Sequence, residues 1–319
     1  MPFHPSIASR LKLLEGIPSK AAAISDPGFR SALEAFDSYP DATPPPSVVT
    51  EERTVPGPHG PVPVRIYRPH GQAKALRPGF VWVHGGAFKF GDLDMREADW
   101  TARDMAATAD AVVISVDYRL AVDGVTYPVP LDDVVSSIRW VRAHSADLGI
   151  SRVSVGGASA GANLAAGAAL RLRDEDGWVP RQLILVYAIL HGTLPPPSES
   201  LAKAQQEMLP VMRLTADVTA GMVKNYVGEE WSTPSGYAMP GSANLTGLGP
   251  TLVLNAEYDD LRASGEAFSA SLAAAGVDIQ QVLVKGLLHG FLNLSRDFTP
   301  VGDALNLMAK QLRVASPGV

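Results

Sequence analysis

The chain of 319 residues is 46% hydrophobic and 19% charged, which is typical of a compact protein and favours one main domain with added elements. Its net charge of −6 would repel the phosphates of nucleic acids, so no nucleic-acid partner is expected. Since the chain contains no cysteine, disulfides, thiolate metal sites and cysteine nucleophiles are excluded, and we expect neither a metal nor another cofactor.

The first fifty residues differ from the rest of the chain. They contain two helix-like stretches, Ile7 to Leu14 and Phe29 to Phe36, followed by the proline-rich run Pro40 to Pro46. Charged residues are scattered through residues 1–20, where a secretory signal would have a continuous apolar segment, so we expect a cytoplasmic protein. Residues 1–50 are therefore interpreted as an added helical segment.

From Val64 onward, apolar runs alternate with stretches of helical periodicity, which predicts an α/β fold whose parallel sheet is covered on both faces. Ligands of such sheets gather at the carboxyl ends of the strands. An exposed edge near Val282 to Val284 could pair two copies into a homodimer. The expected strands are Phe80 to Val83, Ala111 to Val116, Val153 to Val155, Leu183 to Leu190, Thr251 to Leu254 and Val282 to Val284.

Residues 191–231 interrupt this alternation with the prolines at 195–197 and a helix-like stretch from Thr215 to Tyr226. We interpret them as an insertion that forms, with residues 1–50, a helical cap over the strand ends. Two unrelated surface excursions are the alternative. Residues 51–190 and 232–319 would then form the catalytic body.

Residues 157–161 have the pattern G-x-S-x-G between a strand-like run and an alanine-rich, helix-like run. A strand that turns sharply into a helix holds the central serine in a strained conformation and needs small residues beside it, so Ser159 is the predicted nucleophile. An ordinary tight turn is the alternative. The charge-free stretch between Arg152 and Arg171 is also long enough to raise a membrane helix, which requires about 20 apolar residues, but its glycines, serines and Asn163 argue against stable membrane insertion.

The sequence His84-Gly85-Gly86-Ala87 follows the first expected strand. Backbone amides at a glycine-rich turn stabilise the oxyanion of acyl transfer without reorganisation. The amides of Gly85, Gly86 and Ala160 are the expected donors, with His84 shaping the loop through its ring. A simple glycine loop is the alternative.

A serine nucleophile needs a base, and histidine has the most suitable pKa. His289 follows the last expected strand and is the predicted base. Glu257, Asp259 and Asp260 follow the strand before it, so each is a candidate for the acid that orients the histidine. Glu257 is expected to lie still on the strand and Asp260 to cap the next helix, which leaves Asp259 as the best candidate.

Five segments, taken in chain order, resemble those of the hormone-sensitive-lipase-like branch of the α/β-hydrolases, whose bacterial members are carboxylesterases. The resemblance implies a central, mostly parallel eight-stranded sheet flanked by helices, with a helical cap. It also implies a covalent acyl-enzyme, with Ser159 attacking, His289 moving the proton and Asp259 holding His289. The segments are His84 to Phe88, Val116 to Ala121, the Ser159 turn, Ala256 to Arg262 and His289 to Phe291.

The resemblance also implies that Asp117, Tyr118 and Arg119 support the sheet and the glycine loop. Asp260 stands where the family usually has proline, which weakens the choice of Asp259 over Asp260. We expect hydrolysis of short- to medium-chain acyl esters, or of small alkyl and aromatic esters, with Phe88 either lining the pocket or packing in the core. The alternatives are hydrolysis of amides, lactones or carbamates, and a catalytically silent ligand-binding protein.

Overall fold

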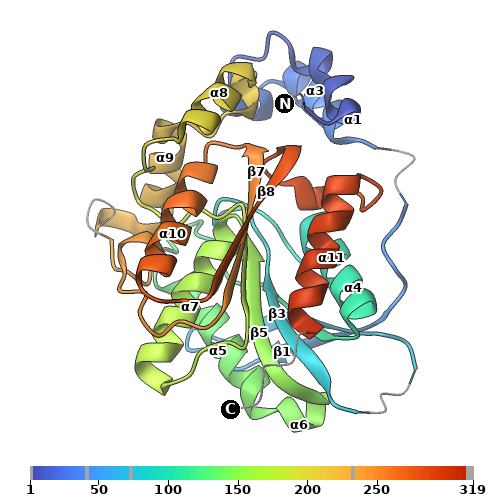
Figure 1. Ribbon diagram of the computed structural model, residues 1–319, viewed down its shortest axis with the longest axis vertical. Helices are drawn as coiled ribbons and strands as arrows, with labels where there is room; N and C mark the ends of the chain where they lie inside the picture. The colour runs from blue at the N-terminus through green and yellow to red at the C-terminus, as the bar shows by residue number, and fades with distance from the viewer. Residues whose placement is uncertain (1–2, 40–42, 72–74, 231–233, 314–319) are drawn as a thin grey trace.

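The computed structural model describes residues 3–39, 43–71, 75–230 and 234–313 (Figure 1). Eight strands form one sheet in the order β1-β2-β4-β3-β5-β6-β7-β8. β2 is antiparallel to β1 and to β4, and the other neighbours are parallel. The expected α/β-hydrolase architecture is confirmed. The strands are β1 (Val49–Val55), β2 (Val62–Arg68), β3 (Arg77–Val83), β4 (Val112–Val116), β5 (Ile150–Ala158), β6 (Leu183–Val186), β7 (Thr251–Tyr258) and β8 (Ile279–Leu288).

Helices cover both faces of the sheet (Figure 1). Side chains alternate between the faces along a strand, so Phe80 and Trp82 of β3 enter one apolar core while Val81 and Val83 enter the other. This double burial explains why the central strands are continuous apolar runs. One face carries α4 (Arg96–Ala109) and α11 (Thr299–Arg313), and the other carries α5 (Val129–Ala143), α7 (Ala160–Asp176) and α10 (Arg262–Ala274), with α6 (Ser145–Leu148) before β5.

The two helical excursions lie at the same end of the molecule, beyond the carboxyl end of β7 (Figure 1). Helix α2 of the first excursion packs against η2 of the second, and α8 packs against β7. The first comprises α1 (Pro5–Ala8), η1 (Leu11–Leu14), α2 (Lys20–Ser25) and α3 (Pro27–Asp37), and the second α8 (Glu199–Glu207), η2 (Pro210–Met212), α9 (Ala216–Val227) and η3 (Gly228–Glu230). The remaining short helices are η4 (Pro240–Ser242) and η5 (Phe291–Asn293).

Two expected elements have different limits in the structure. The strand expected to reach Leu190 ends at Val186, and Tyr187 turns the chain with a φ of +38°. Residues 187–190 are apolar because they are buried and not because they are extended. The helix expected from Ile7 to Leu14 is two short helices whose apolar spacing reflects separate buried contacts. Pro40 and the predicted boundary between residues 231 and 232 lie outside the described residues.

Candidate active site

Ser159 lies at the turn from β5 into α7, at the carboxyl end of the strand. Its φ is +52°, a left-handed value that residues other than glycine rarely adopt. Both flanking glycines are sterically required, because a Cβ on Gly157 would collide with the backbone of Gly161, and a Cβ on Gly161 would collide with that of Val83. The Ser159 N–H donates to the Val186 carbonyl oxygen at 2.9 Å, which holds the turn against β6.

His289 and Asp259 form a hydrogen-bonded line with Ser159. His289 follows β8, and its Nε2 lies 3.0 Å from Ser159 Oγ. On the other side of the ring, Nδ1 lies 2.8 Å from Asp259 Oδ2. Asp259 is buried, and its second oxygen accepts the Leu261 N–H at 3.0 Å. The structure therefore brings together the three side chains that the sequence analysis selected.

Asp260 does not cap the following helix, contrary to the expectation. The residue that precedes α10 is Leu261, and the Asp260 carboxylate points instead toward the second helical excursion. It accepts hydrogen bonds from the Arg213 guanidinium at 2.8 Å, from Gln205 Nε2 at 2.8 Å and from the Leu214 N–H at 2.7 Å. Asp260 thus anchors residues 205–214 beside the Asp259 turn.

The loop of residues 84–88, which we call the oxyanion loop, differs from the expectation at one amide. The Gly85 N–H donates to Glu97 Oε1 at 2.6 Å, so it is not available to an oxyanion. A Cβ on Gly85 would lie 3.0 Å from Ser159 Cβ, so the loop runs directly beside the serine. Among the described residues, no acceptor is found for the next two amides, those of Gly86 and Ala87. These two and the amide of Ala160 are the better candidates for oxyanion donors.

Buried polar groups near the ends of β3 and β4 form hydrogen bonds with the backbone of the oxyanion loop. His84 is buried, which lowers its pKa, and its Nδ1–H donates to the Gly85 carbonyl oxygen at 2.7 Å. The Tyr118 hydroxyl donates to the His84 carbonyl oxygen at 3.1 Å. Arg119 pairs with the buried Asp133 at 2.5 Å. The contacts of His84 and Tyr118 agree with the supporting roles expected for them, whereas the Arg119 pair joins the segment after β4 to α5.

Phe88 belongs to the core and does not line a pocket. Its side chain is fully buried and stacks on Tyr226 of α9, with ring centroids 4.0 Å apart and an interplanar angle of 3°. The aromatic pair has no surface left for a substrate. Of the two roles considered for Phe88, the structure favours packing.

Two further residues of the site were missed by the sequence analysis, Glu97 on α4 and Tyr187 after β6. Both are buried, and the Tyr187 hydroxyl donates to Glu97 Oε2 at 2.5 Å. Glu97 lies on the same buried face of α4 as Ala98 and Thr101. An acidic residue within such a face is the sequence signal that could have drawn attention to it.

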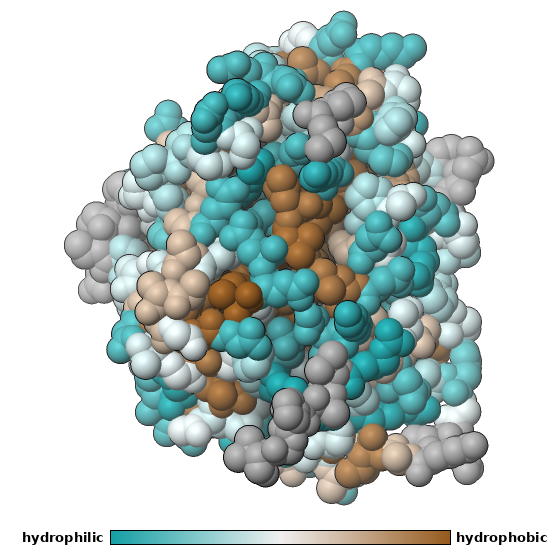
Figure 2. Space-filling view, in the orientation of Figure 1, coloured by the Kyte–Doolittle hydropathy of each residue, from teal (hydrophilic) through white to brown (hydrophobic). Residues whose placement is uncertain are grey.

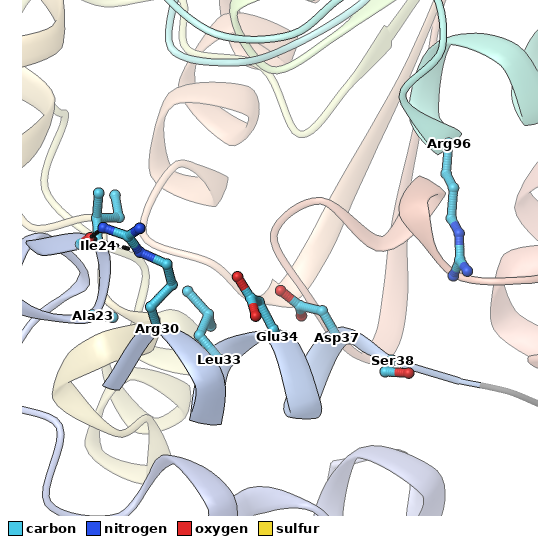
Figure 3. A pocket seen from close by; sticks show the side chains of 8 residues that line it. All are labelled: Ala23, Ile24, Arg30, Leu33, Glu34, Asp37, Ser38 and Arg96. Carbon is cyan, nitrogen blue, oxygen red and sulfur yellow. Dashed lines mark hydrogen bonds between the residues drawn. The ribbon is translucent and has the colours of Figure 1, made fainter. Parts of the chain in front are cut away.

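A cavity of about 530 Å³ opens between the first helical excursion and the N-terminus of α4 (Figure 3). Glu34 and Asp37 point into it from α3, and Arg96 extends toward it from α4. Its lining includes none of Ser159, Asp259, His289 and the oxyanion loop; Arg96 adjoins in sequence Glu97, which bonds that loop. Its wall is completed by Ala23, Ile24, Arg30, Leu33 and Ser38.

Comparison with known proteins decides the family. A sequence model described as the alpha/beta hydrolase fold matches residues 80–293, a range that includes Ser159, Asp259 and His289. The chain belongs to this family. Within the described ranges, no helix of this α/β-hydrolase is both long enough and apolar enough to cross a membrane.

The relatives of this α/β-hydrolase lie in the hormone-sensitive-lipase-like branch. The chain is 33% identical to esterase LipI of Mycobacterium tuberculosis over 323 residues, covering 97% of this chain and 94% of the relative. It is 36% identical to carboxylesterase NlhH of the same species over 275 residues, covering 83% and 82%. The solved structure of a hyperthermophilic esterase from Pyrobaculum calidifontis superposes with a TM-score of 0.78 at 30% identity, covering 98% of each chain.

Proposed function

We propose that this carboxylesterase hydrolyses short- to medium-chain acyl esters, or small alkyl and aromatic esters, through a Ser-His-Asp triad and a covalent acyl-enzyme. The observation that carries the proposal is the line from Ser159 Oγ through His289 to Asp259, with separations of 3.0 and 2.8 Å. Both distances are within the range that proton transfer requires. The line ends at a serine beside a loop of free amides, which is the arrangement that acyl transfer needs.

In the first half-reaction, His289 Nε2 accepts the hydroxyl proton of Ser159 while Oγ bonds to the carbonyl carbon of the ester. The carbonyl oxygen becomes an oxyanion that accepts hydrogen bonds from the amides of Gly86, Ala87 and Ala160. The intermediate then breaks its bond to the alcohol oxygen, which takes the proton from His289. The acyl group remains on Ser159.

In the second half-reaction, a water molecule gives its proton to His289 and attacks the acyl carbon. The bond to Oγ breaks, Ser159 regains its proton from His289, and the carboxylic acid leaves. Asp259 accepts the Nδ1–H of His289 throughout, which keeps Nε2 free as the base and stabilises the imidazolium that forms twice per cycle.

We further propose that the two helical excursions act as one cap, and that the acyl chain extends from Ser159 toward the cavity beside α3 that Leu33 lines. We expect a panel of p-nitrophenyl esters to show the highest kcat/KM between acetate and octanoate. Leu33→Trp narrows the cavity, so it should lower kcat/KM for octanoate about tenfold and leave acetate within about threefold. Ala35→Trp places the same side chain on the exposed side of α3 and is the control.

Three results would contradict parts of this proposal. Faster cleavage of p-nitroacetanilide than of p-nitrophenyl acetate would indicate an amide hydrolase, since the same acyl chemistry serves both substrates. Absence of a product burst with every activated ester would indicate a ligand-binding protein. If Leu33→Trp lowered kcat/KM equally for all acyl-chain lengths, the cavity would not be the site that binds the acyl chain.

The partner that we propose for the edge of the sheet is a second copy of this chain. Among the strands that the structure describes, only β7 pairs with β8. Val282 and Leu283 of β8 are half-buried, and Figure 2 shows hydrophobic side chains gathered over this part of the face. We expect a dimer by light scattering that Val282→Lys converts to a monomer and Val218→Lys on α9 does not. A monomeric unsubstituted protein at micromolar concentration would contradict it.

A further inference from the structure

Glu97 is a buried carboxyl group that the proposed reaction does not use. It lies in the first turn of α4 and is 2% exposed. One oxygen accepts the Gly85 N–H at 2.6 Å and the other accepts the Tyr187 hydroxyl at 2.5 Å. Within the described ranges, no lysine or arginine forms an ion pair with it, and burial raises its pKa. Burial of a carboxyl whose hydrogen-bond donors among the described residues are these two groups is costly, and the same contacts place it between the oxyanion loop and His289.

The backbone of Glu97 is tied to the loop that carries His289. Its N–H donates to Asn293 Oδ1 at 3.1 Å, and Asn293 Nδ2 donates to the carbonyl oxygen of Gly290 at 3.1 Å. Gly290 directly follows His289. Glu97 therefore contacts the oxyanion loop through its side chain and the histidine loop through its backbone.

Tyr187 adds a second connection between the same two parts. Its ring lies 4.9 Å from the imidazole of His289 and 4.9 Å from the ring of Phe291, measured between centroids. Its N–H donates to the Leu254 carbonyl oxygen at 2.7 Å, which fixes it to β7. The backbone of Tyr187 is thus bonded to β7 and its ring packs against His289 and Phe291, which together place its hydroxyl at Glu97.

We propose that Glu97 is a positioning residue that fixes the oxyanion loop relative to His289 and Ser159. The inference rests on the proposed function, because it assumes that the amides of Gly86 and Ala87 receive the oxyanion. By holding the Gly85 N–H, the carboxyl fixes the residue just before these two amides. Donors of this kind stabilise the oxyanion only where they point at its position, and a displacement of about 1 Å can cost about 100-fold in rate.

Substitution of Glu97 tests this role. We expect Glu97→Ala to lower kcat about 100-fold with KM within about threefold, because the loss falls on the transition state. Glu97→Gln keeps an oxygen that accepts the Gly85 N–H, so it should stay within about tenfold of the unsubstituted enzyme. The affinity for a trifluoromethyl ketone, which forms a tetrahedral oxyanion on the serine, should fall in parallel with kcat.

Asp104→Ala is the matched control. Asp104 is also a buried carboxyl of α4, but it pairs with Arg296 at 2.8 Å and is not bonded to the oxyanion loop. We expect this variant to lose thermal stability and to keep its kcat. A kcat of Glu97→Ala equal to that of Asp104→Ala, with unchanged affinity for the ketone, would overturn the proposal.

If Glu97→Ala does not fold, Tyr187→Phe decides the question. It retains the ring packing against His289 and removes only the hydroxyl that holds Glu97. We expect kcat to fall about tenfold at constant KM, the size of a lost hydrogen bond felt in the transition state. An unchanged kcat would overturn the proposal. Failure of the proposed function would be recognised separately, since the unsubstituted protein would then not hydrolyse esters at all.

Discussion

Replacement of Ser159 by alanine is expected to lower kcat/KM for p-nitrophenyl butyrate by about 10⁴- to 10⁶-fold. The loss is this large because members of a triad act as a unit, and removal of one is nearly as severe as removal of all. The remaining rate would come from the oxyanion donors and from substrate binding. The same variant should no longer be labelled by a serine-directed organophosphate, which can be followed by the mass of the intact protein.

Ser154→Ala is the control for this experiment. Ser154 is buried on β5, the strand that ends next to Ser159, but it is not hydrogen-bonded to His289. Its alanine variant should retain labelling and turnover. Because the strained φ of residue 159 is imposed by its neighbours, Ser159→Ala should also melt near the temperature of the unsubstituted protein. Stoichiometric labelling of the alanine variant at the same rate would exclude Ser159 as the nucleophile.

The contacts around Ser159 show why some of this site could be predicted from the sequence. The G-x-S-x-G pattern reports a steric demand, and the structure contains the close approaches of Gly157 and Gly161 that create it. His289 and Asp259 could be selected because each follows an apolar run, and parallel strands deliver such residues to one edge. These features depend on residues near in sequence or on the regular geometry of a sheet.

Other parts of the site depend on contacts that no local pattern reveals. The direction of the Gly85 N–H is fixed by Glu97, which enters from another element. The local pattern predicts that Asp260 caps a helix, because that is a common role of aspartate, but its carboxylate binds Arg213, which is distant in the sequence. The apolar run up to Leu190 could not be divided into strand and buried loop, since burial makes both apolar.

Replacement of Asp259 by asparagine is expected to lower kcat by about 10⁴-fold with little change in KM. The buried carboxylate accepts the Nδ1–H of His289, and an amide at this position can donate to Nδ1 instead. The imidazole would then carry its proton on Nε2, where it cannot accept the proton of Ser159. A steady-state assay across pH 6 to 9 measures this loss.

Asp260→Asn is the matched comparison, since it makes the same chemical change in the adjacent buried residue. Asp260 binds Arg213 and the Leu214 N–H rather than His289, so kcat should stay within about fivefold of the unsubstituted enzyme. Urea unfolding should nevertheless show a loss of about 1–3 kcal/mol, because Arg213 keeps its charge without a full partner. Opposite kinetic results for the two variants would transfer the acid role to Asp260. A loss of turnover in both would mean that the contact between the cap and residues 259–260 also orients His289.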